Sequence, residues 1–202
     1  APADGAYTIV VTNYDGTTSY GPYTLQLSVD SSSNGELTDS GTVSFTDVDL
    51  ADGHGVSVDA HDGGYLGQLT AYVSDDSYGD GTGEVEWTFS VGNPAIQHLG
   101  EGETLTQTYT LTVDDGRGGQ ATQDLTITIT GTNDVPVIQS GSTLGDTVED
   151  QISDAFGQLD FTDIDLSDSH VVSFTPVGEG YYGSFNASLA DDSTGDGYGQ
   201  IG

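Results

Sequence analysis

The sequence predicts an all-β protein built from tandem β-sandwich repeats. Apolar and polar residues alternate over short segments, as they do in strands that have one buried face. Turns rich in glycine and aspartate separate these segments, and no helical periodicity persists for three turns. One stretch, residues 44–57, recurs at residues 160–173, and a fixed period without gaps is typical of a repeated structural unit.

The two copies share one register. Residues 44–57 read SFTDVDLADGHGVS and residues 160–173 read DFTDIDLSDSHVVS. The offset is 116 residues, as between Phe45 and Phe161, and it holds without a gap as far as Gly81 and Gly197. We therefore expect one kind of unit to occur twice, with aspartates at matching places.

The charge balance restricts the possible partners. The 202 residues include 33 acidic side chains, one arginine and no lysine, and the formal net charge is -32. This composition excludes nucleic acid as a partner, because there are too few basic residues to contact phosphate. The sequence also contains no run of 18 apolar residues, so it does not predict a membrane-spanning segment. Self-repulsion at this level disfavours a compact state unless cations screen or bind the carboxylates. A halophilic surface and specific divalent-cation sites both meet that need, and the repeated Asp-x-Asp-x-x-Asp pattern favours the second.

The first segment is predicted to be a hairpin. Residues 6–13 and 22–29 alternate around an Asp-Gly turn, and residues 30–40 have the composition of a linker. We interpret residues 1–30 as the closing hairpin of a preceding β domain, with a hairpin donated to a second chain as the alternative. Cysteine is absent, which excludes disulfides, and the absence of methionine predicts an internal fragment of a longer protein.

A complete repeat is predicted over residues 31–138. Its strands are expected at 41–47, 55–59, 66–74, 83–91, 104–113 and 121–130. This number of short strands in about a hundred residues is typical of an immunoglobulin-like β-sandwich. Trp87 is interpreted as a core residue, together with Val85, Phe89 and Tyr109.

A second repeat is predicted over residues 139–202, and it is incomplete. By the 116-residue offset Gly202 corresponds to Glu86, so the last three strands have no counterpart. The opening hairpin is similar in pattern to residues 108–130, which close the complete repeat. Two interpretations stay open: a cut through a longer array, or head-to-tail filaments in which one chain's hairpin completes the next chain's unit.

The motifs resemble a known family. FTDVDLADGH at 45–54, the run at 102–138 and VED at 148–150 resemble VCBS repeats, the cadherin-like modules of giant secreted RTX-type bacterial adhesins. The resemblance covers residues 33–202, while residues 1–30 resemble the end of a pre-peptidase C-terminal type domain. It implies an extracellular, immunoglobulin/cadherin-like sandwich at the bacterial cell surface, calcium near domain junctions, and a part in cell adhesion or biofilm. The expected partners are neighbouring repeats of the same chain.

The predicted calcium ligands are oxygen-bearing side chains. Calcium takes 6–8 hard oxygen ligands, and an Asp-x-Asp pair presents two carboxylates on one face of an extended segment. The likeness to the cadherin arrangement implies one junction site made of Asn133, Asp134, Glu149, Asp150, Asp163 and Asp165, with Asp114 or Asp115 from the preceding hairpin. Asp47 and Asp49 are expected to act in the same way toward whatever precedes residue 30, although Ser33-Asn34 replace Glu149-Asp150 there. Asp168 stays an open candidate.

Other polar residues are given structural interpretations. Asp75, Asp76 and Asp80 lack the spacing of an EF-hand loop and are interpreted as turn residues, as are their copies Asp191, Asp192 and Asp196. His54 and His170 are predicted to make structural hydrogen bonds rather than to bind zinc, because there is no cysteine and no second histidine at ligand spacing. No nucleophile elbow is present, so an enzyme is not expected. The predicted function is a calcium-stabilised extender segment, with a strand-complemented filament and a tyrosine-rich carbohydrate-binding module as alternatives.

Overall fold

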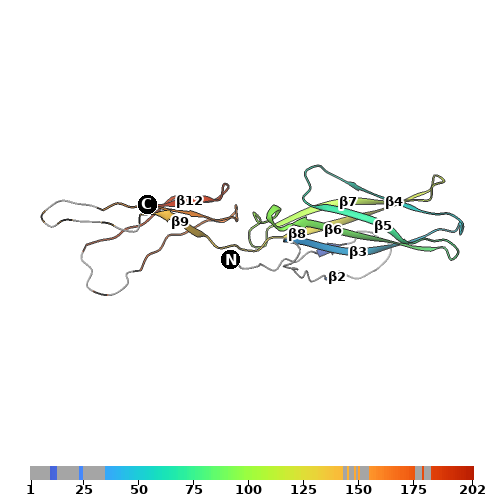
Figure 1. The fold of residues 1–202 in the computed structure, drawn as a ribbon, viewed down its shortest axis with the longest axis horizontal. Helices are drawn as coiled ribbons and strands as arrows, with labels where there is room; N and C mark the ends of the chain where they lie inside the picture. The colour runs from blue at the N-terminus through green and yellow to red at the C-terminus, as the bar shows by residue number, and fades with distance from the viewer. Residues whose placement is uncertain are drawn as a thin grey trace. The chain divides into compact units, whose positions relative to one another are not determined.

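The protein folds into strands that form two compact units (Figure 1). The structure is a computed structural model that describes residues 10–12, 23–24, 35–142, 145, 148, 150, 155–175, 179 and 183–202. Unit 1 comprises Ala1–Ile96 and Gly102–Gly131, and unit 2 comprises Gln97–Glu101 and Thr132–Gly202. The described elements are strands, apart from the single 3-10 turn η1 (Asn93–Ala95), so the all-β prediction is confirmed. None of the described residues forms a helix of the length and apolarity needed to cross a membrane.

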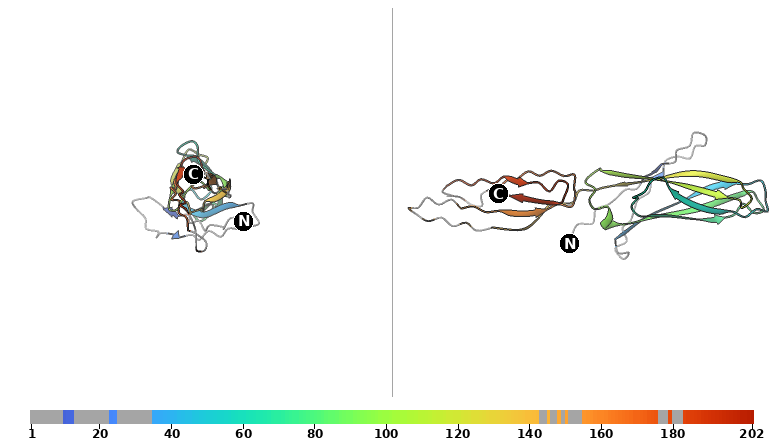
Figure 2. Two further views of the ribbon diagram at one scale, coloured as in Figure 1. Left: turned by 90° about the vertical axis from the view of Figure 1, so that its left-hand side faces the viewer. Right: turned by 90° about the horizontal axis from the view of Figure 1, so that it is seen from above.

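Unit 1 contains two antiparallel sheets, whose strands run along a common direction (Figures 1 and 2). The five-stranded sheet has the order β2 (Tyr23–Thr24), β1 (Val10–Thr12), β8 (Gln120–Thr130), β7 (Thr104–Asp114) and β4 (Gly55–Ala60). The three-stranded sheet has the order β3 (Glu36–Thr46), β6 (Thr82–Gly92) and β5 (Gln68–Asp75). The six strands predicted for residues 41–130 are therefore confirmed, each to within a few residues at its ends.

Alternation along the strands builds the core of unit 1. Every second residue of β6 is buried, and Trp87 is 4 % exposed. This confirms the interpretation of Trp87, Val85, Phe89 and Tyr109 as core residues. The indole of Trp87 lies over Gly41, where an added Cβ would be 2.6 Å from Cζ2. Only glycine at position 41 leaves the space that this ring occupies.

The described part of the opening hairpin joins unit 1. Val10 of β1 pairs with Thr24 of β2 on one side and with Thr128 of β8 on the other. The predicted hairpin pairing is thus present, but its strand extends the sheet of unit 1 instead of standing in a separate domain. This pairing also covers one edge of β8, a strand edge that would otherwise be open for another chain.

Strand β3 begins at Glu36, five residues before the predicted start at position 41. The segment 30–40 was predicted to be a linker because serine, aspartate, asparagine and glycine dominate it. Leu37 and Asp39 nevertheless alternate toward the core and are 2 % and 5 % exposed. Burial raises the pKa of Asp39, although the Ser40 N–H donates to its Oδ1. Its other oxygen, Oδ2, is buried and has no hydrogen-bond partner among the described residues.

Replacing Asp39 by valine is expected to stabilise unit 1. An unpartnered buried polar group costs about 1–3 kcal/mol, and valine favours a strand. Because folding raises the pKa of Asp39, the wild type loses stability as the pH rises through that range. The advantage of the variant should therefore be present at neutral pH and disappear below a pH of about 3.9. Urea unfolding at both pH values measures this, and the exposed Glu36→Val variant is the control for the loss of one charge.

Unit 2 contains one four-stranded antiparallel sheet in the described residues. Its order is β11 (Leu189–Asp191), β12 (Tyr198–Ile201), β10 (Leu159–Thr162) and β9 (Val137–Gly141). β9 was predicted only as a stiff exit from the first repeat, because Pro136 precedes it. Counterparts of β7 and β8 are not found among the described residues of unit 2. Phe185 is accordingly 69 % exposed, whereas its copy in unit 1, Leu69, is 7 % exposed.

Candidate metal centre

The repeated motif folds into the same hydrogen-bonded loop in both units. In unit 1 the N–H of Asp49 donates to Oδ1 of Asp47 over 2.8 Å. In unit 2 the N–H of Asp165 donates to Oδ1 of Asp163 over 3.0 Å. The first aspartate of each Asp-x-Asp pair is therefore oriented by the backbone of the second, as in an Asx turn.

A histidine bridges two aspartates beside the unit 1 loop. His54 lies 2.7 Å from Oδ1 of Asp76 through Nδ1 and 3.0 Å from Oδ2 of Asp47 through Nε2. The hydrogen bond to Asp76, followed by that to Asp47, raises the pKa of His54 despite its burial. Because both ring nitrogens are engaged, His54 is a structural residue here and not a metal ligand.

The histidine of unit 2 repeats this arrangement. His170 lies 2.7 Å from Asp192 through Nδ1 and 2.9 Å from Asp163 through Nε2. Burial lowers the pKa of His170, but the hydrogen bonds to Asp192 and Asp163 outweigh it and the net shift is upward. The prediction of structural hydrogen bonds for both histidines is confirmed. Asp76 and Asp192, which were interpreted as turn residues, have the additional role of holding these rings.

Three carboxylates converge at the unit 1 loop. One ligand oxygen each from Asp47, Asp52 and Asp115 lie within 4.8 Å of one another. Arg117, the chain's one basic residue apart from histidine, places Nε 2.7 Å from Oδ1 of Asp52. Asp47 was predicted to be a ligand from the sequence, whereas Asp52 was given no role. Asp52 is the copy of Asp168. Asp49, which was also predicted, is exposed and is not part of this group.

Asp114 and Asp115 lie at the opposite end of unit 1 from Gly131, its last residue. Asp114 ends β7, where it accepts a hydrogen bond from Gln120 at 2.6 Å. Thr130, the last residue of β8, pairs with Thr104, the first residue of β7. Asp114 is the last residue of this 11-residue strand, so it lies about 33 Å from Thr104 and from the point where the chain leaves unit 1. The predicted contribution of this hairpin to the later junction is therefore corrected. Asp115 belongs with Asp47 at the other end of unit 1.

Four aspartates of unit 2 lie close together, and we refer to Asp134, Asp163, Asp165 and Asp168 as the unit 2 aspartate set. The N–H of Asp134 donates to Oδ2 of Asp165 over 2.6 Å. Asp163 is 3 % exposed and Asp165 is fully buried. The backbone of Asp168 returns to the same place, because its N–H donates to the carbonyl of Asp165 over 3.1 Å. These contacts place Asp134, Asp163 and Asp165 beside one another, while their predicted role as metal ligands stays a prediction.

The unit 2 aspartate set is electrostatically unfavourable without a cation. Burial raises the pKa of Asp165, and the nearby carboxylates of Asp134, Asp163 and Asp168 raise it further. The hydrogen bond from the Asp134 N–H lowers this pKa but does not cancel the rise. Burial and the charge of Asp163 raise the pKa of Asp134 as well. Oδ1 of Asp165 is buried and finds no hydrogen-bond partner among the described residues. A buried anionic oxygen of this kind requires a proton or a positive charge beside it.

The other predicted ligands have different positions. Asn133 is exposed and donates through Nδ2 to the carbonyl of Asp134. Asp150 is an exposed turn residue with a φ of +63°, and the described contacts of the set do not include it. Glu149 lies outside the described residues.

Gly100 borders the set, which the sequence did not indicate. A Cβ added at Gly100 would lie 2.8 Å from Oγ of Ser167 and 3.1 Å from Oδ1 of Asp168. Residue 100 must therefore be small for its backbone to approach these side chains. Sequence spacing gave no sign of this contact, because Gly100 precedes the set by more than thirty positions.

Comparison with known proteins adds no relative. No family model matches the chain, and no curated protein matches it.

The donor set of unit 2 suits a hard divalent cation. It offers carboxylate oxygens, which favour calcium, magnesium or manganese over zinc or copper. Calcium accepts irregular geometry and 6–8 oxygens, whereas magnesium demands a near-ideal octahedron. Asp165 fits the role of a ligand, because Oδ1 is buried without a hydrogen-bond partner among the described residues and the charges of Asp134, Asp163 and Asp168 act on this carboxyl group. The oxygens of this set are less closely gathered than those of Asp47, Asp52 and Asp115, the group that lies within 4.8 Å among the described residues.

Proposed function

We propose that this chain is a calcium-stabilised structural repeat, an extender segment of a secreted protein at a bacterial surface. The buried, unpartnered Oδ1 of Asp165 inside the unit 2 aspartate set carries the proposal. A cation bound there neutralises part of the formal charge of -32 and offsets the cost of burying Asp163 and Asp165 beside two half-buried carboxylates. The tandem sandwich architecture and the extracellular location are part of this proposal, and the repeated loop supports them.

The ion is proposed to fix the chain between the units. Asp134 follows Gly131, the last residue of unit 1, after only two residues. The loop that begins at Asp163 lies much later in the chain, yet Asp134 bonds to Asp165 within it. An ion shared by these carboxylates would hold Asp134, so that only Thr132 and Asn133 would connect it to the last residue of unit 1. A short linker of this kind restricts hinge motion, which is what an extender requires.

Calcium is expected to stiffen the whole chain and to stabilise it. Small-angle scattering and thermal unfolding are measured first in EDTA and then in millimolar calcium chloride. At a calcium concentration of 100 times Kd, one site adds about 2.7 kcal/mol of stability. The expected result is a higher melting temperature and a narrower distribution of dimensions for a monomer, with magnesium at the same ionic strength as the control. If chelation left both quantities unchanged, the proposal would fail.

A second candidate function is a filament joined by strand complementation. One observation favours it: unit 2 has large apolar side chains that are uncovered, with Val171 93 % and Phe185 69 % exposed. The pairing of β1 with β8 counts against it, because the hairpin that would be donated is engaged in its own unit. Electron microscopy of the whole chain in calcium tests it. Fibres that vanish when residues 1–30 are deleted would favour the filament over the extender.

A further inference from the structure

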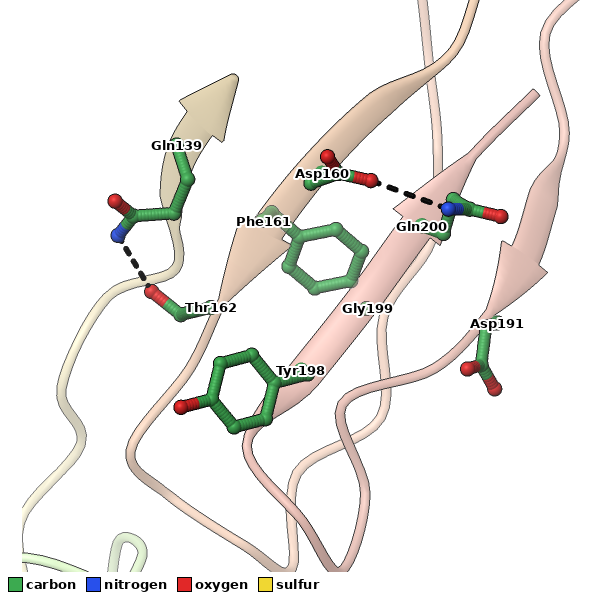
Figure 3. Close-up of a pocket in the computed structure, with 8 residues that line it drawn as sticks. All are labelled: Gln139, Asp160, Phe161, Thr162, Asp191, Tyr198, Gly199 and Gln200. Atoms are coloured by element: carbon green, nitrogen blue, oxygen red, sulfur yellow. Dashed lines mark hydrogen bonds between the residues drawn. The ribbon is translucent and has the colours of Figure 1, made fainter. Parts of the chain in front are cut away.

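Unit 2 carries a groove that the metal centre does not use. Its volume is about 510 Å³. The residues that line it come from all four strands of the unit 2 sheet (Figure 3): Gln139, Asp160, Phe161, Thr162, Asp191, Tyr198, Gly199 and Gln200. The side chain of Phe161 lies on the opposite, inner face of the sheet, because it is 4 % exposed and a Cβ added to Gly199 would be 2.1 Å from its ring. The outward-facing side chains of the other residues therefore form the groove.

An exposed aromatic ring lies in this groove. Tyr198 is 69 % exposed, and its ring extends from β12 toward β10 (Figure 3). A tyrosine ring offers an apolar face together with a polar edge, and leaving it in water forgoes the free energy of burial. An exposed tyrosine alone is common, but this one is surrounded by ordered polar side chains.

Two hydrogen-bonded pairs lie on the same sheet as the ring, one beside it and one further along. Nε2 of Gln139 donates to Oγ1 of Thr162 over 2.8 Å, and Nε2 of Gln200 donates to Oδ1 of Asp160 over 3.1 Å (Figure 3). Ser140 also donates to Asp160, over 2.9 Å. Gln139 and Gln200 each use one amide N–H in these contacts, and each amide has a second N–H and a carbonyl oxygen. The side chains are therefore held in place while retaining donors and acceptors, which lowers the entropy cost of binding.

The same face of unit 1 lacks these groups, although β3, β6 and β5 correspond to β10, β12 and β11; β9 has no counterpart in that sheet. By the 116-residue offset, Thr82 stands where unit 2 has Tyr198, and Glu84 stands where it has Gln200. Ser44 stands in the place of Asp160. These positions face outward in both units, so neither the strands nor the core require tyrosine and glutamine there.

We propose that this groove binds a neutral sugar residue of a glycan. The ring of Tyr198 offers a platform for the apolar face of a pyranose. The amides of Gln139 and Gln200 and the carboxylate of Asp160 match hydroxyl groups, which both donate and accept. Asp160 and Asp191 disfavour anionic sugars, and the chain supplies no lysine to attract them. The proposal is independent of the calcium centre, whose residues it does not share.

Saturation-transfer NMR on the whole chain tests the groove. The probes are glucose, galactose, mannose, N-acetylglucosamine, lactose and cellobiose at millimolar concentration, first in calcium and then in EDTA. At least one probe is expected to give a saturable signal in both conditions. Tyr198→Ala should weaken binding at least about tenfold, because the ring supplies the apolar contact. Gln200→Glu, which introduces the residue of unit 1, should weaken it as well.

Tyr72→Ala is the matched control, since Tyr72 is a 56 % exposed tyrosine on the sheet of unit 1. It should leave sugar binding unchanged, and Tyr72→Ala and Tyr198→Ala should keep the melting temperature of the wild type. The absence of a saturable signal for every probe overturns the proposal, as does equal binding by the Tyr198→Ala variant. Binding of tetralysine in place of sugars would assign the groove to cationic peptides and would also overturn it. None of these results depends on whether calcium stiffens the chain.

Discussion

Replacing Asp165 by asparagine is expected to remove most of the effect of chelation on stability. In EDTA the variant should be more stable than the wild type by about 1–3 kcal/mol, because it removes a buried charge with an unpartnered oxygen. In saturating calcium the wild type gains about 2.7 kcal/mol at 100 times Kd, and the variant should lose most of this gain. Differential scanning calorimetry in both conditions measures the two shifts for the calcium-sensitive transition.

The repeat supplies the control for this experiment. Asp49 is the copy of Asp165 in unit 1, but it is exposed and carries no buried unpartnered oxygen. Asp49→Asn should change stability little in either condition, since exposed substitutions usually stay within about 0.5 kcal/mol. Loss of stability by Asp165→Asn in EDTA would contradict the account, because the carboxylate would then be favourable without a cation.

Replacing Trp87 by alanine is expected to destabilise unit 1 by about 3–5 kcal/mol. The ring is 4 % exposed and fills the centre of the three-stranded sheet, so its loss removes apolar burial and leaves a cavity. Trp87→Phe should cost less because it retains part of the ring volume. Urea unfolding followed by circular dichroism is the suitable measurement, since the chain has one tryptophan and its fluorescence disappears in both variants.

A double-mutant cycle tests the contact of Trp87 with Gly41. Gly41→Ala should cost about 1–3 kcal/mol in the wild type, because the new Cβ would lie 2.6 Å from Cζ2 of the ring. In the Trp87→Ala background the same substitution should cost almost nothing. Additive effects of the two substitutions would show that the ring does not determine the requirement for glycine at position 41.

The strands of unit 1 could be predicted because apolar and polar residues alternate along each of them and turn residues mark their ends. β3 was shortened because Asp39 occupies a core-facing position where a hydrophobic residue is expected. β9 was missed because it follows Pro136 and all its residues are exposed, so it has no alternation to detect. The pairing of β1 with β8 joins residues more than a hundred positions apart, which local patterns do not determine.

The metal centre could be predicted only in part. The repeated Asp-x-Asp pattern pointed to Asp163 and Asp165. The likeness to junction sites, which include a linker residue, added Asp134, and Asp134 does lie beside these two residues. Asp115 was assigned to the wrong end of unit 1, because a sequence does not show at which end of a sheet a hairpin turns. The approach of Gly100 to Asp168 depends on tertiary packing and had no sequence signal apart from the glycine itself.

Calorimetric titration of the whole chain with calcium tests the central claim, that a cation binds the unit 2 aspartate set. The account predicts a saturable heat of binding that is lost in Asp165→Asn and retained in Asp49→Asn. Lowering the pH should weaken the binding, because protons compete for carboxyl groups whose pKa values burial has raised, those of Asp134 and Asp165. A chain that shows no saturable heat, or an Asp165→Asn variant that binds calcium as the wild type does, would contradict the account.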